Sequence, residues 1–175
     1  MNEAQLQDTP SGQAPATEGW FVVNVRDAAW VTRPGFGSGA RFESSDAAFQ
    51  QFGINIRVLE PGDANARYHS ETAQEDFLVL AGSCLLLVEG EERELHAWDF
   101  VHCPPGTEHV FVGAGDVPCA ILAVGTRTGD GVVYPVSEVA LKHAAGVEQE
   151  AHTGAEAYAG LQPDEDAEFQ EAWLP

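Results

Sequence analysis

The chain has 175 residues and a mass of 18.7 kDa, which suits one globular domain with terminal segments. Its 28 acidic residues against 8 basic ones give a formal charge of −20. This balance argues against nucleic-acid and anionic-membrane partners, because clustered Lys and Arg bind both. There is neither an apolar run of the roughly 18 residues that cross a bilayer nor an export signal at the N-terminus. We therefore expect a cytoplasmic protein.

The N-terminal and central zones of the chain differ in composition and in the pattern of their apolar residues. Residues 1–18 are rich in Gln, Thr, Pro, Ser and Ala without periodicity, and predict a disordered leader. Residues 19–136 alternate short apolar runs with Gly, Pro and Asp, which is typical of an all-β sandwich or small barrel. The expected strands are 20–25, 52–59, 76–80, 84–89, 100–103, 109–112 and 119–126. Three cysteines in apolar surroundings, Cys84, Cys103 and Cys119, are expected to be buried reduced thiols.

The remaining zone, residues 137–175, is strongly acidic. Residues 136–145 have the composition of a short helix, and residues 148–171 carry eight acids and no Lys or Arg. Two interpretations are open. The segment is either a solvated acidic tail, or it docks on the barrel or on a partner through Trp173 and Leu174.

Four polar side chains of the central zone can converge on one metal ion. His69 and Glu71 are two positions apart in an extended segment and so share a face, and Glu75 follows at the start of the next strand. His109 begins another strand, after a rigid Pro-Pro-Gly turn. Two imidazoles with one or two carboxylates suit Zn²⁺, Fe²⁺, Mn²⁺ or Ni²⁺. Taken alone, His69 is better explained as a surface or hydrogen-bonded histidine than as a ligand, and the alternative for Glu71 and Glu75 is a solvated face.

Two motifs of the central zone resemble those of the cupin superfamily. The first cupin motif runs from a Gly through His-x-His and a Glu to a second Gly, and it resembles residues 62–82, with His69 and Glu75 in place. The second contains Pro-x-Gly-x-x-His and resembles residues 98–113, with Pro104, Gly106 and His109 in register. With their flanking strands, the motifs cover about two fifths of the chain, and they most resemble stand-alone conserved-barrel cupins.

The resemblance to the motifs is partial at several positions. Glu71 occupies the place of the second His of the first motif. An alternative register puts Tyr68 and Ser70 at the two histidine places, which leaves Glu75 with a single His partner. In the second motif, Trp98 replaces the Gly and Gly113 replaces the Asn.

The resemblance implies a double-stranded β-helix, or jelly-roll barrel, with one divalent metal inside it. By this likeness His69, Glu71, Glu75 and His109 are the metal ligands, and the metal is Zn, Fe, Mn or Ni. The family is often dimeric, so we expect a homodimer formed through residues 20–25.

Catalytic roles are expected for two residues beside the ligand set. His102 has the strand parity of Phe100 and is expected to face the cavity as an acid, base or fifth ligand; the alternative is a structural histidine. Tyr68 is expected at the mouth of the barrel. Arg57 either binds an acidic substrate or forms surface ion pairs.

Three functions remain open at this stage. The first is a metal-dependent enzyme acting on a small oxygenated molecule, either an isomerase or epimerase or a non-haem iron dioxygenase. The second is a non-catalytic barrel that binds or senses a small ligand. The third is a structural barrel whose metal site has decayed.

Overall fold

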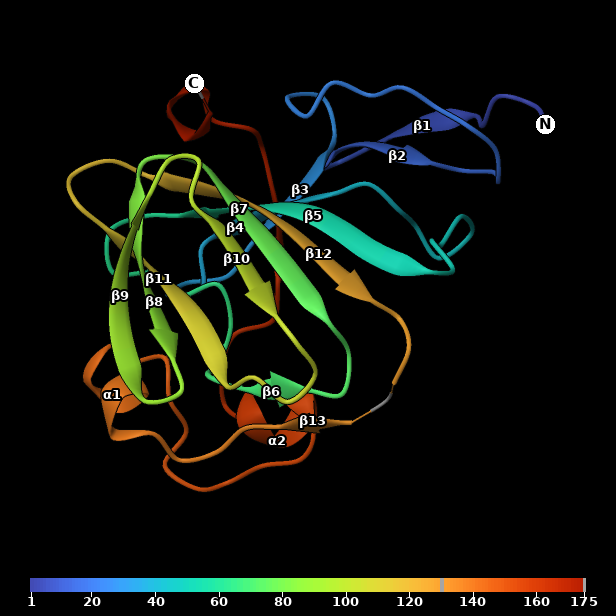
Figure 1. Ribbon diagram of the computed structural model, residues 1–175. Coiled ribbons are helices and arrows are strands. Elements are labelled where there is room, and N and C mark those ends of the chain that lie inside the picture. The colour runs from blue at the N-terminus through green and yellow to red at the C-terminus, as the bar shows by residue number, and fades with distance from the viewer. Residues whose placement is uncertain (130, 175) are drawn as a thin grey trace.

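The computed structural model describes residues 1–129 and 131–174, and β-strands dominate it (Figure 1). The only helical segments of the described chain are short and lie after residue 137. The elements are β1 (Leu6–Thr9), β2 (Gly12–Pro15), β3 (Ala29–Thr32), β4 (Ser38–Arg41), β5 (Phe52–Leu59), β6 (Ser70–Glu71), β7 (Glu75–Ala81), β8 (Ser83–Val88), β9 (Glu91–His96), β10 (Phe100–Cys103), β11 (His109–Ala114), β12 (Cys119–Thr126), β13 (Val132–Val133), α1 (Glu138–Lys142), α2 (Gly154–Ala157), β14 (Glu165–Ala167) and the 3₁₀ turn η1 (Glu171–Trp173).

Two antiparallel sheets face each other and form a jelly-roll barrel. The large sheet has the order β10-β7-β12-β5-β4-β3-β14, and the small sheet has the order β11-β8-β9. Apolar side chains from both sheets fill the space between them; they are Leu59, Phe77, Val79, Cys84, Leu86, Cys103, Phe111, Cys119 and Ile121. The expected all-β barrel is confirmed, and all three cysteines are buried and free.

The large sheet buries apolar side chains on both of its faces. The alternating Ile56 and Val58 of β5 do not point into the barrel but join Trp30, Ala40, Ala120 and Trp173 in a second core on the other face. Asn55 and Arg57 of β5 point to the opposite face of the sheet. Arg57 is paired with Ile121 of β12, so it lies on the same face as this residue of the barrel core. The sheet thus extends beyond the barrel and needs a cover of its own.

Strand predictions succeeded where the apolar pattern was strong. Residues 52–59, 100–103 and 119–126 form strands with the expected bounds, whereas residues 20–25 form no strand. The sheet is continued instead by β3 and β4, whose short sequences carry little alternation. Strand β9 also went unpredicted, because four of its six residues are charged and nearly all of it is exposed. Its pairing with β8 holds it in place.

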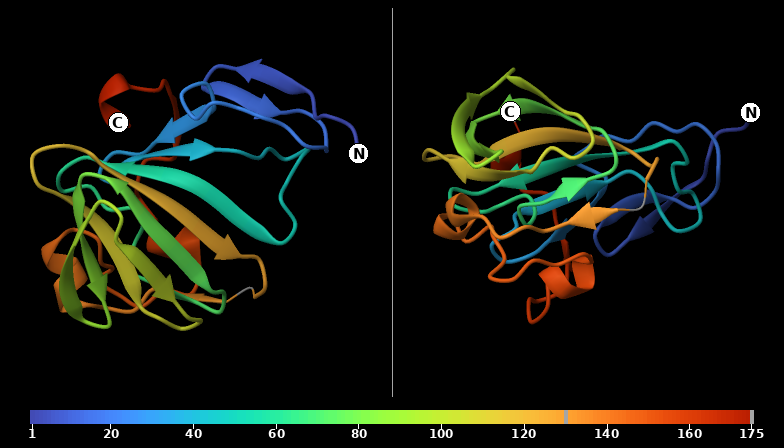
Figure 2. Two further views of the ribbon diagram at one scale, coloured as in Figure 1. Left: turned by 45° about the horizontal axis from the view of Figure 1, so that its top comes forward. Right: turned by 60° about the horizontal axis from the view of Figure 1, so that its bottom comes forward.

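The expected disorder of residues 1–18 differs from the structure, in which β1 and β2 form a hairpin. The Thr9 hydroxyl donates to the Gly12 carbonyl at 2.6 Å and closes the turn. Backbone hydrogen bonds from Gln13 to Asp27 and from Trp30 to Ser11 tie the hairpin to the start of β3. The hairpin projects beside β3 in both views of Figure 2. These contacts are backbone contacts, which the composition of the segment does not reveal.

The C-terminal arm, defined here as residues 158–174, docks on the large sheet. β14 pairs with β3, and the Trp173 ring packs on Trp30 with centroids 4.8 Å apart. Phe169 completes this cluster at 5.9 Å from Trp30. Of the two interpretations of the acidic segment, the structure therefore favours docking on the barrel. Helix α1 lies within the expected helical stretch of residues 136–145.

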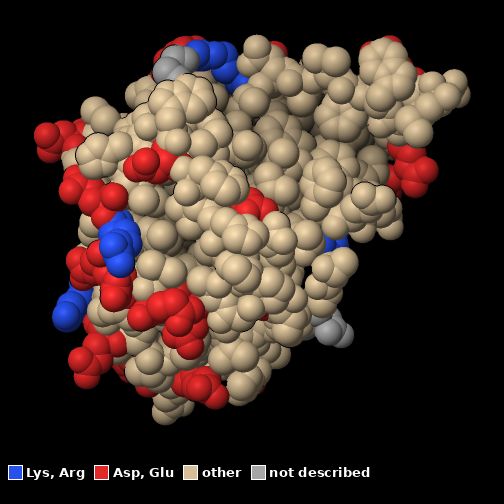
Figure 3. All heavy atoms as spheres, viewed as in Figure 1, with Lys and Arg blue, Asp and Glu red and all other residues tan. Residues whose placement is uncertain are grey.

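Charge is unevenly distributed over the surface. Acidic side chains gather along the side of the molecule where β9 lies, including Glu91, Glu92 and Glu94, whereas the face over β7, β10 and β12 is mostly uncharged (Figure 3). Among the described residues, no helix has the length and apolarity that a membrane span requires.

Docking of the C-terminal arm predicts a large effect of a single truncation in it. Trp173 is only 5% exposed, so Trp173→Ala should lower the free energy of unfolding by about 3 kcal/mol, as for other buried aromatic side chains. Val22→Ala is the control, because Val22 is 80% exposed and its truncation should change stability by less than about 0.5 kcal/mol. Urea unfolding measures both. Equal midpoints for the two variants would show that the arm does not stabilise the sheet.

Candidate metal centre

A pair of backbone hydrogen bonds brings the two candidate histidine ligands together. The amide of His109 donates to the carbonyl of His69 at 2.8 Å, and the amide of His69 donates to the carbonyl of His109 at 3.2 Å. Residues paired in this way in antiparallel strands project their side chains on the same face. The centroids of the two imidazole rings accordingly lie 5.0 Å apart.

Each histidine is oriented by a second hydrogen bond through its other ring nitrogen. The Nδ1 atom of His69 lies 2.7 Å from the carbonyl of Arg67, and that of His109 lies 3.0 Å from the carbonyl of Thr107. A carbonyl only accepts, so Nδ1 of each ring carries the hydrogen and Nε2 presents a lone pair. Metal-binding histidines are commonly held in this manner.

Glu75 adds a carboxylate between the two Nε2 atoms. Its Oε2 is 3.4 Å from Nε2 of His109 and 3.8 Å from Nε2 of His69. Two donors at about 2.1 Å from one ion lie at most about 4.2 Å apart, so these spacings suit a shared cation. One donor atom from each of His69, Glu75 and His109 lies within 4.8 Å of the others.

Burial keeps the cluster close to neutral before any metal binds. It lowers the pKa of His109 to about 4, with the neighbouring His69 acting in the same direction. Burial also lowers the pKa of His69. It raises the pKa of Glu75 to about 7, and the Glu71 carboxyl adds to this rise. The centre therefore holds two neutral imidazoles beside a carboxyl that ionises near neutral pH.

The Nε2 atom of His109 shows whether these residues fit a metal ion. His109 is 1% exposed, and its Nε2 atom has no hydrogen-bond partner in the described part of the chain. A buried acceptor without a donor costs about 1–3 kcal/mol, unless another group uses its lone pair. A cation between Nε2 and Glu75 would do so, and two His with one carboxylate form a donor set that divalent transition metals accept.

Glu71 lies at the rim of the cluster rather than in its middle. Its Oε1 is 3.6 Å from Nε2 of His69, and its side chain is 37% exposed. Burial still raises the pKa of Glu71. The residue also borders a cavity of about 530 Å³, which is lined by Ser70, Glu71, Thr72, Pro105, Gly106, Gly131, Val132, Val133 and His152. Glu71 thus connects the three-residue cluster to the exterior.

The two expected catalytic residues lie away from the cluster. His102 is paired across the strands with Asp76, which points to the face of the sheet opposite to that of Glu75. On this exposed face, Nδ1 of His102 forms a hydrogen bond of 2.6 Å with the Asp76 carboxylate. The expectation that His102 faces the interior is corrected by this register. Tyr68 is fully buried in a separate apolar cluster, where its hydroxyl accepts a hydrogen bond from the amide of Gly90. Tyr68 therefore does not lie at a mouth of the barrel.

Tyr134 is a residue of the site that sequence reasoning missed. Its ring lies 5.8 Å from that of His69, and burial raises its pKa to about 12. It follows β13, which pairs with β6 and so covers the segment that carries Glu71. The two segments are some sixty positions apart, and no motif in the sequence connects them.

Comparison with known proteins agrees with this architecture. Residues 55–125 match the family described as Cupin domain. Residues 55–125 of the chain thus form a cupin domain. No curated protein matches the chain.

Several solved structures are similar to this chain. The polyketide cyclase RemF from Streptomyces resistomycificus matches with a TM-score of 0.56 and 20% identity over 65% of this chain and 84% of its own, which shows a common fold. A putative sugar phosphate isomerase from Acidithiobacillus ferrooxidans is 28% identical over 47% of this chain, with a TM-score of 0.44, and only 54% of that chain is covered. A sugar phosphate isomerase from Silicibacter pomeroyi is 23% identical over 79% of this chain and 83% of its own, with a TM-score of 0.48.

Two departures from the cupin motifs have a structural explanation. Trp98 stands where the motif has Gly and adopts a φ of +77°, a conformation that glycine adopts without strain. Gly113 stands where the motif has Asn, and a Cβ there would lie 2.3 Å from the carbonyl oxygen of Glu60. The backbone therefore keeps the turn before β10 but leaves no room for a side chain at position 113.

The raised pKa of Glu75 predicts a pH-dependent metal affinity. Below about pH 7 the carboxyl is protonated and a metal must displace its proton, whereas His69 and His109 have lowered pKa values and do not compete until the pH is lower. The apparent zinc affinity should fall about tenfold for each pH unit below pH 7, down to about pH 5. Competition with a chelating indicator measures it. Glu75→Gln should bind more weakly and without this slope; an equal slope in this variant would contradict the role of Glu75.

Proposed function

We propose that this cupin binds one divalent metal through His69, Glu75 and His109, with Glu71 as an additional ligand at the rim. The observation that supports it most directly is the buried Nε2 of His109, which has no partner among the described residues and faces the Glu75 carboxylate at 3.4 Å. Both imidazoles are already held in the tautomer that a metal requires.

The protein residues supply orientation, charge and exclusion of water. The carbonyls of Arg67 and Thr107 fix the rings, and Glu75 supplies the negative charge that offsets a dication. Phe77, packed 5.3 Å from His109, closes the inner side of the cluster. A bound metal would act as a Lewis acid toward an oxygen atom of a ligand.

We propose further that a small oxygenated molecule reaches this centre through the cavity beside Glu71. A volume of about 530 Å³ lies in the range of small-molecule sites. The cavity borders Glu71 at the rim of the cluster, and it presents Ser70, Thr72 and His152 as polar groups. Its walls from β13 and from the Pro105-Gly106 turn are apolar or small, which suits a compact ligand over a charged polymer.

The proposed ligand set predicts the metal content of single variants. His109→Ala and Glu75→Gln should each lose most of the metal, since each removes a central donor, while Glu71→Ala should lose less. His102→Ala is the matched control and should keep the wild-type content, because its imidazole is on the outer face. Elemental analysis of protein purified without an affinity-tag metal measures the stoichiometry. Unchanged content in both central variants would contradict the ligand assignment.

Metal binding should also raise thermal stability by mass action. At a free concentration of 100 times Kd, the metal should add about 2.7 kcal/mol to the free energy of unfolding, if it binds only the folded chain. Calorimetry with and without the metal tests this, and the gain should disappear in Glu75→Gln. The metal found by elemental analysis then directs the assay. Iron calls for oxygen-consumption assays with small acids and phenols, whereas zinc, manganese or nickel calls for isomerisation and ligand-binding assays.

A further inference from the structure

A second cavity lies beside the large sheet and is separate from the metal centre. Its volume is about 170 Å³. None of the residues that line it belongs to the metal cluster or to the cavity beside Glu71. The lining consists of Val31, Thr32, Arg33, Phe36, Gly37, Arg57, Asn65, Tyr158 and Asp164.

Positive charge outnumbers negative charge at this second cavity. Arg33 and Arg57 both line it, and the one carboxylate in its lining is that of Asp164. Asp164 is already shared, because Oδ1 lies 2.9 Å from Nε of Arg33 and Oδ2 lies 2.9 Å from Nη2 of Arg41. Two of the chain's eight basic residues, Arg33 and Arg41, therefore share this single acid, and a third, Arg57, lines the same cavity, in a protein whose net charge is −20.

Arg57 is held in place without a counter-ion of its own. Its Nη2 donates to the carbonyls of Phe36 at 2.8 Å and Asn65 at 3.2 Å, and its buried Nε has no acceptor in the described residues. No carboxylate of the described chain lies within ion-pair distance of it. Gly39 leaves room for the guanidinium, since a Cβ there would lie 2.6 Å from Nη1.

The electrostatic environment of Arg57 agrees with this geometry. Burial lowers its pKa; Asp164 opposes that effect, and Arg33 and Arg41 add to it. A desolvated cation beside two like charges is costly to maintain. An anion entering the cavity would offset this cost, and guanidinium groups are the side chains best suited to carboxylate and phosphate oxygens.

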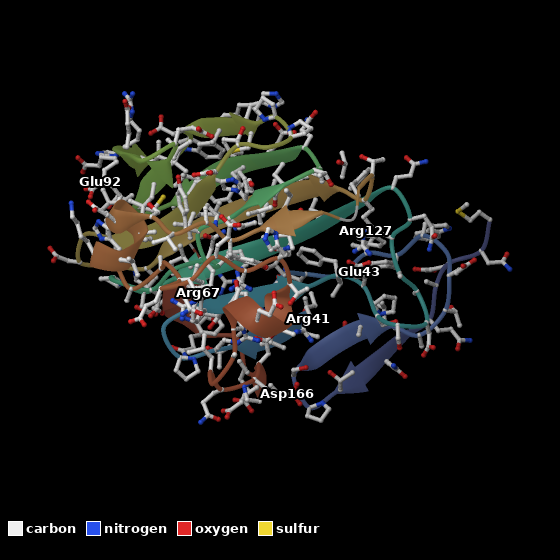
Figure 4. All side chains as sticks on the ribbon, turned by 90° about the horizontal axis from the view of Figure 1, so that it is seen from below. Arg41, Glu43, Arg67, Glu92, Arg127 and Asp166 are labelled. Carbon is white, nitrogen blue, oxygen red and sulfur yellow. The ribbon has the colours of Figure 1, made fainter. Side chains whose placement is uncertain are left out.

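Asp164 belongs to the C-terminal arm, between α2 and β14, and is not part of the barrel. Figure 4 shows Arg41 and Arg67 beside the ribbon of this C-terminal region. Tyr158, from the same arm, lines the cavity; its hydroxyl accepts a hydrogen bond from the amide of Arg67, and its own hydrogen remains a donor. The arm therefore contributes both a competing acid and a donor.

We propose that this second cavity is a binding site for a small oxyanion, a carboxylate or phosphate, held by Arg33 and Arg57, and that Asp164 is the internal carboxylate it displaces. A volume of about 170 Å³ leaves room for inorganic phosphate or a short carboxylate. The proposal does not depend on the metal centre, because the two sites share no residue.

Calorimetric titration of the full-length, metal-free protein with inorganic phosphate tests the site, at an ionic strength held constant with sodium chloride. We expect one phosphate per chain, and acetate should compete with it. Arg33→Gln should weaken binding at least tenfold. Arg93→Gln should leave binding unchanged, because Arg93 is exposed on β9 and pairs with Glu91.

A second variant keeps the test decisive if the arginine variants fold poorly. Asp164→Asn removes the internal competitor and should tighten phosphate binding roughly tenfold, whereas a purely structural network gives no such gain. His109→Ala should bind phosphate like the wild type, so failure of the metal site and failure of this site are distinguishable. Absence of phosphate binding in both the wild type and Asp164→Asn would overturn the proposal, as would equal binding by Arg33→Gln and the wild type.

Discussion

The reciprocal hydrogen bonds between His69 and His109 are the constraint on which the site depends. They join the segment before β6 to the first residue of β11, and they bring two imidazoles from distant positions onto one face. Glu75 reaches the same point because β7 begins shortly after β6 and pairs with β12 and β10. The carbonyls that orient the rings belong to residues two positions before each histidine, so one extended conformation both places and orients the ligands.

The site could be predicted from sequence to the extent that local spacing determines it. His69, Glu75 and His109 stand in motif positions, and the structure brings their side chains together. His102 was misplaced because the parity of a four-residue strand cannot be assigned without its partner: Val101 and Cys103 face the interior, and the exposed Phe100 shares the outer face with His102. Tyr134 was missed because its contact with His69 depends on the pairing of β13 with β6, which leaves no local pattern.

In the fold, too, features set by local sequence were predictable, whereas contacts between distant segments were not. Strands with alternating or continuous apolar residues were predictable, as β5 and β12 show. The apolar face of β5, however, packs against the C-terminal arm rather than inside the barrel. Periodicity reveals that one face is buried but not which element covers it. Backbone pairing holds the hairpin of β1 and β2 and the charged strand β9 in place. Side-chain composition gives little information about such pairing.

The pairing of β14 with β3 also bears on how the protein is made. These strands lie more than 130 positions apart, and β3 precedes every strand of the barrel. During synthesis the free edge of β3 and the indole of Trp30 emerge early, yet they receive their cover only after residues 165–173 have been added. Contacts between such distant segments form slowly, and an uncovered strand edge is prone to pairing with other chains. The nascent chain therefore passes through a stage in which the barrel can close while its flank remains open to association.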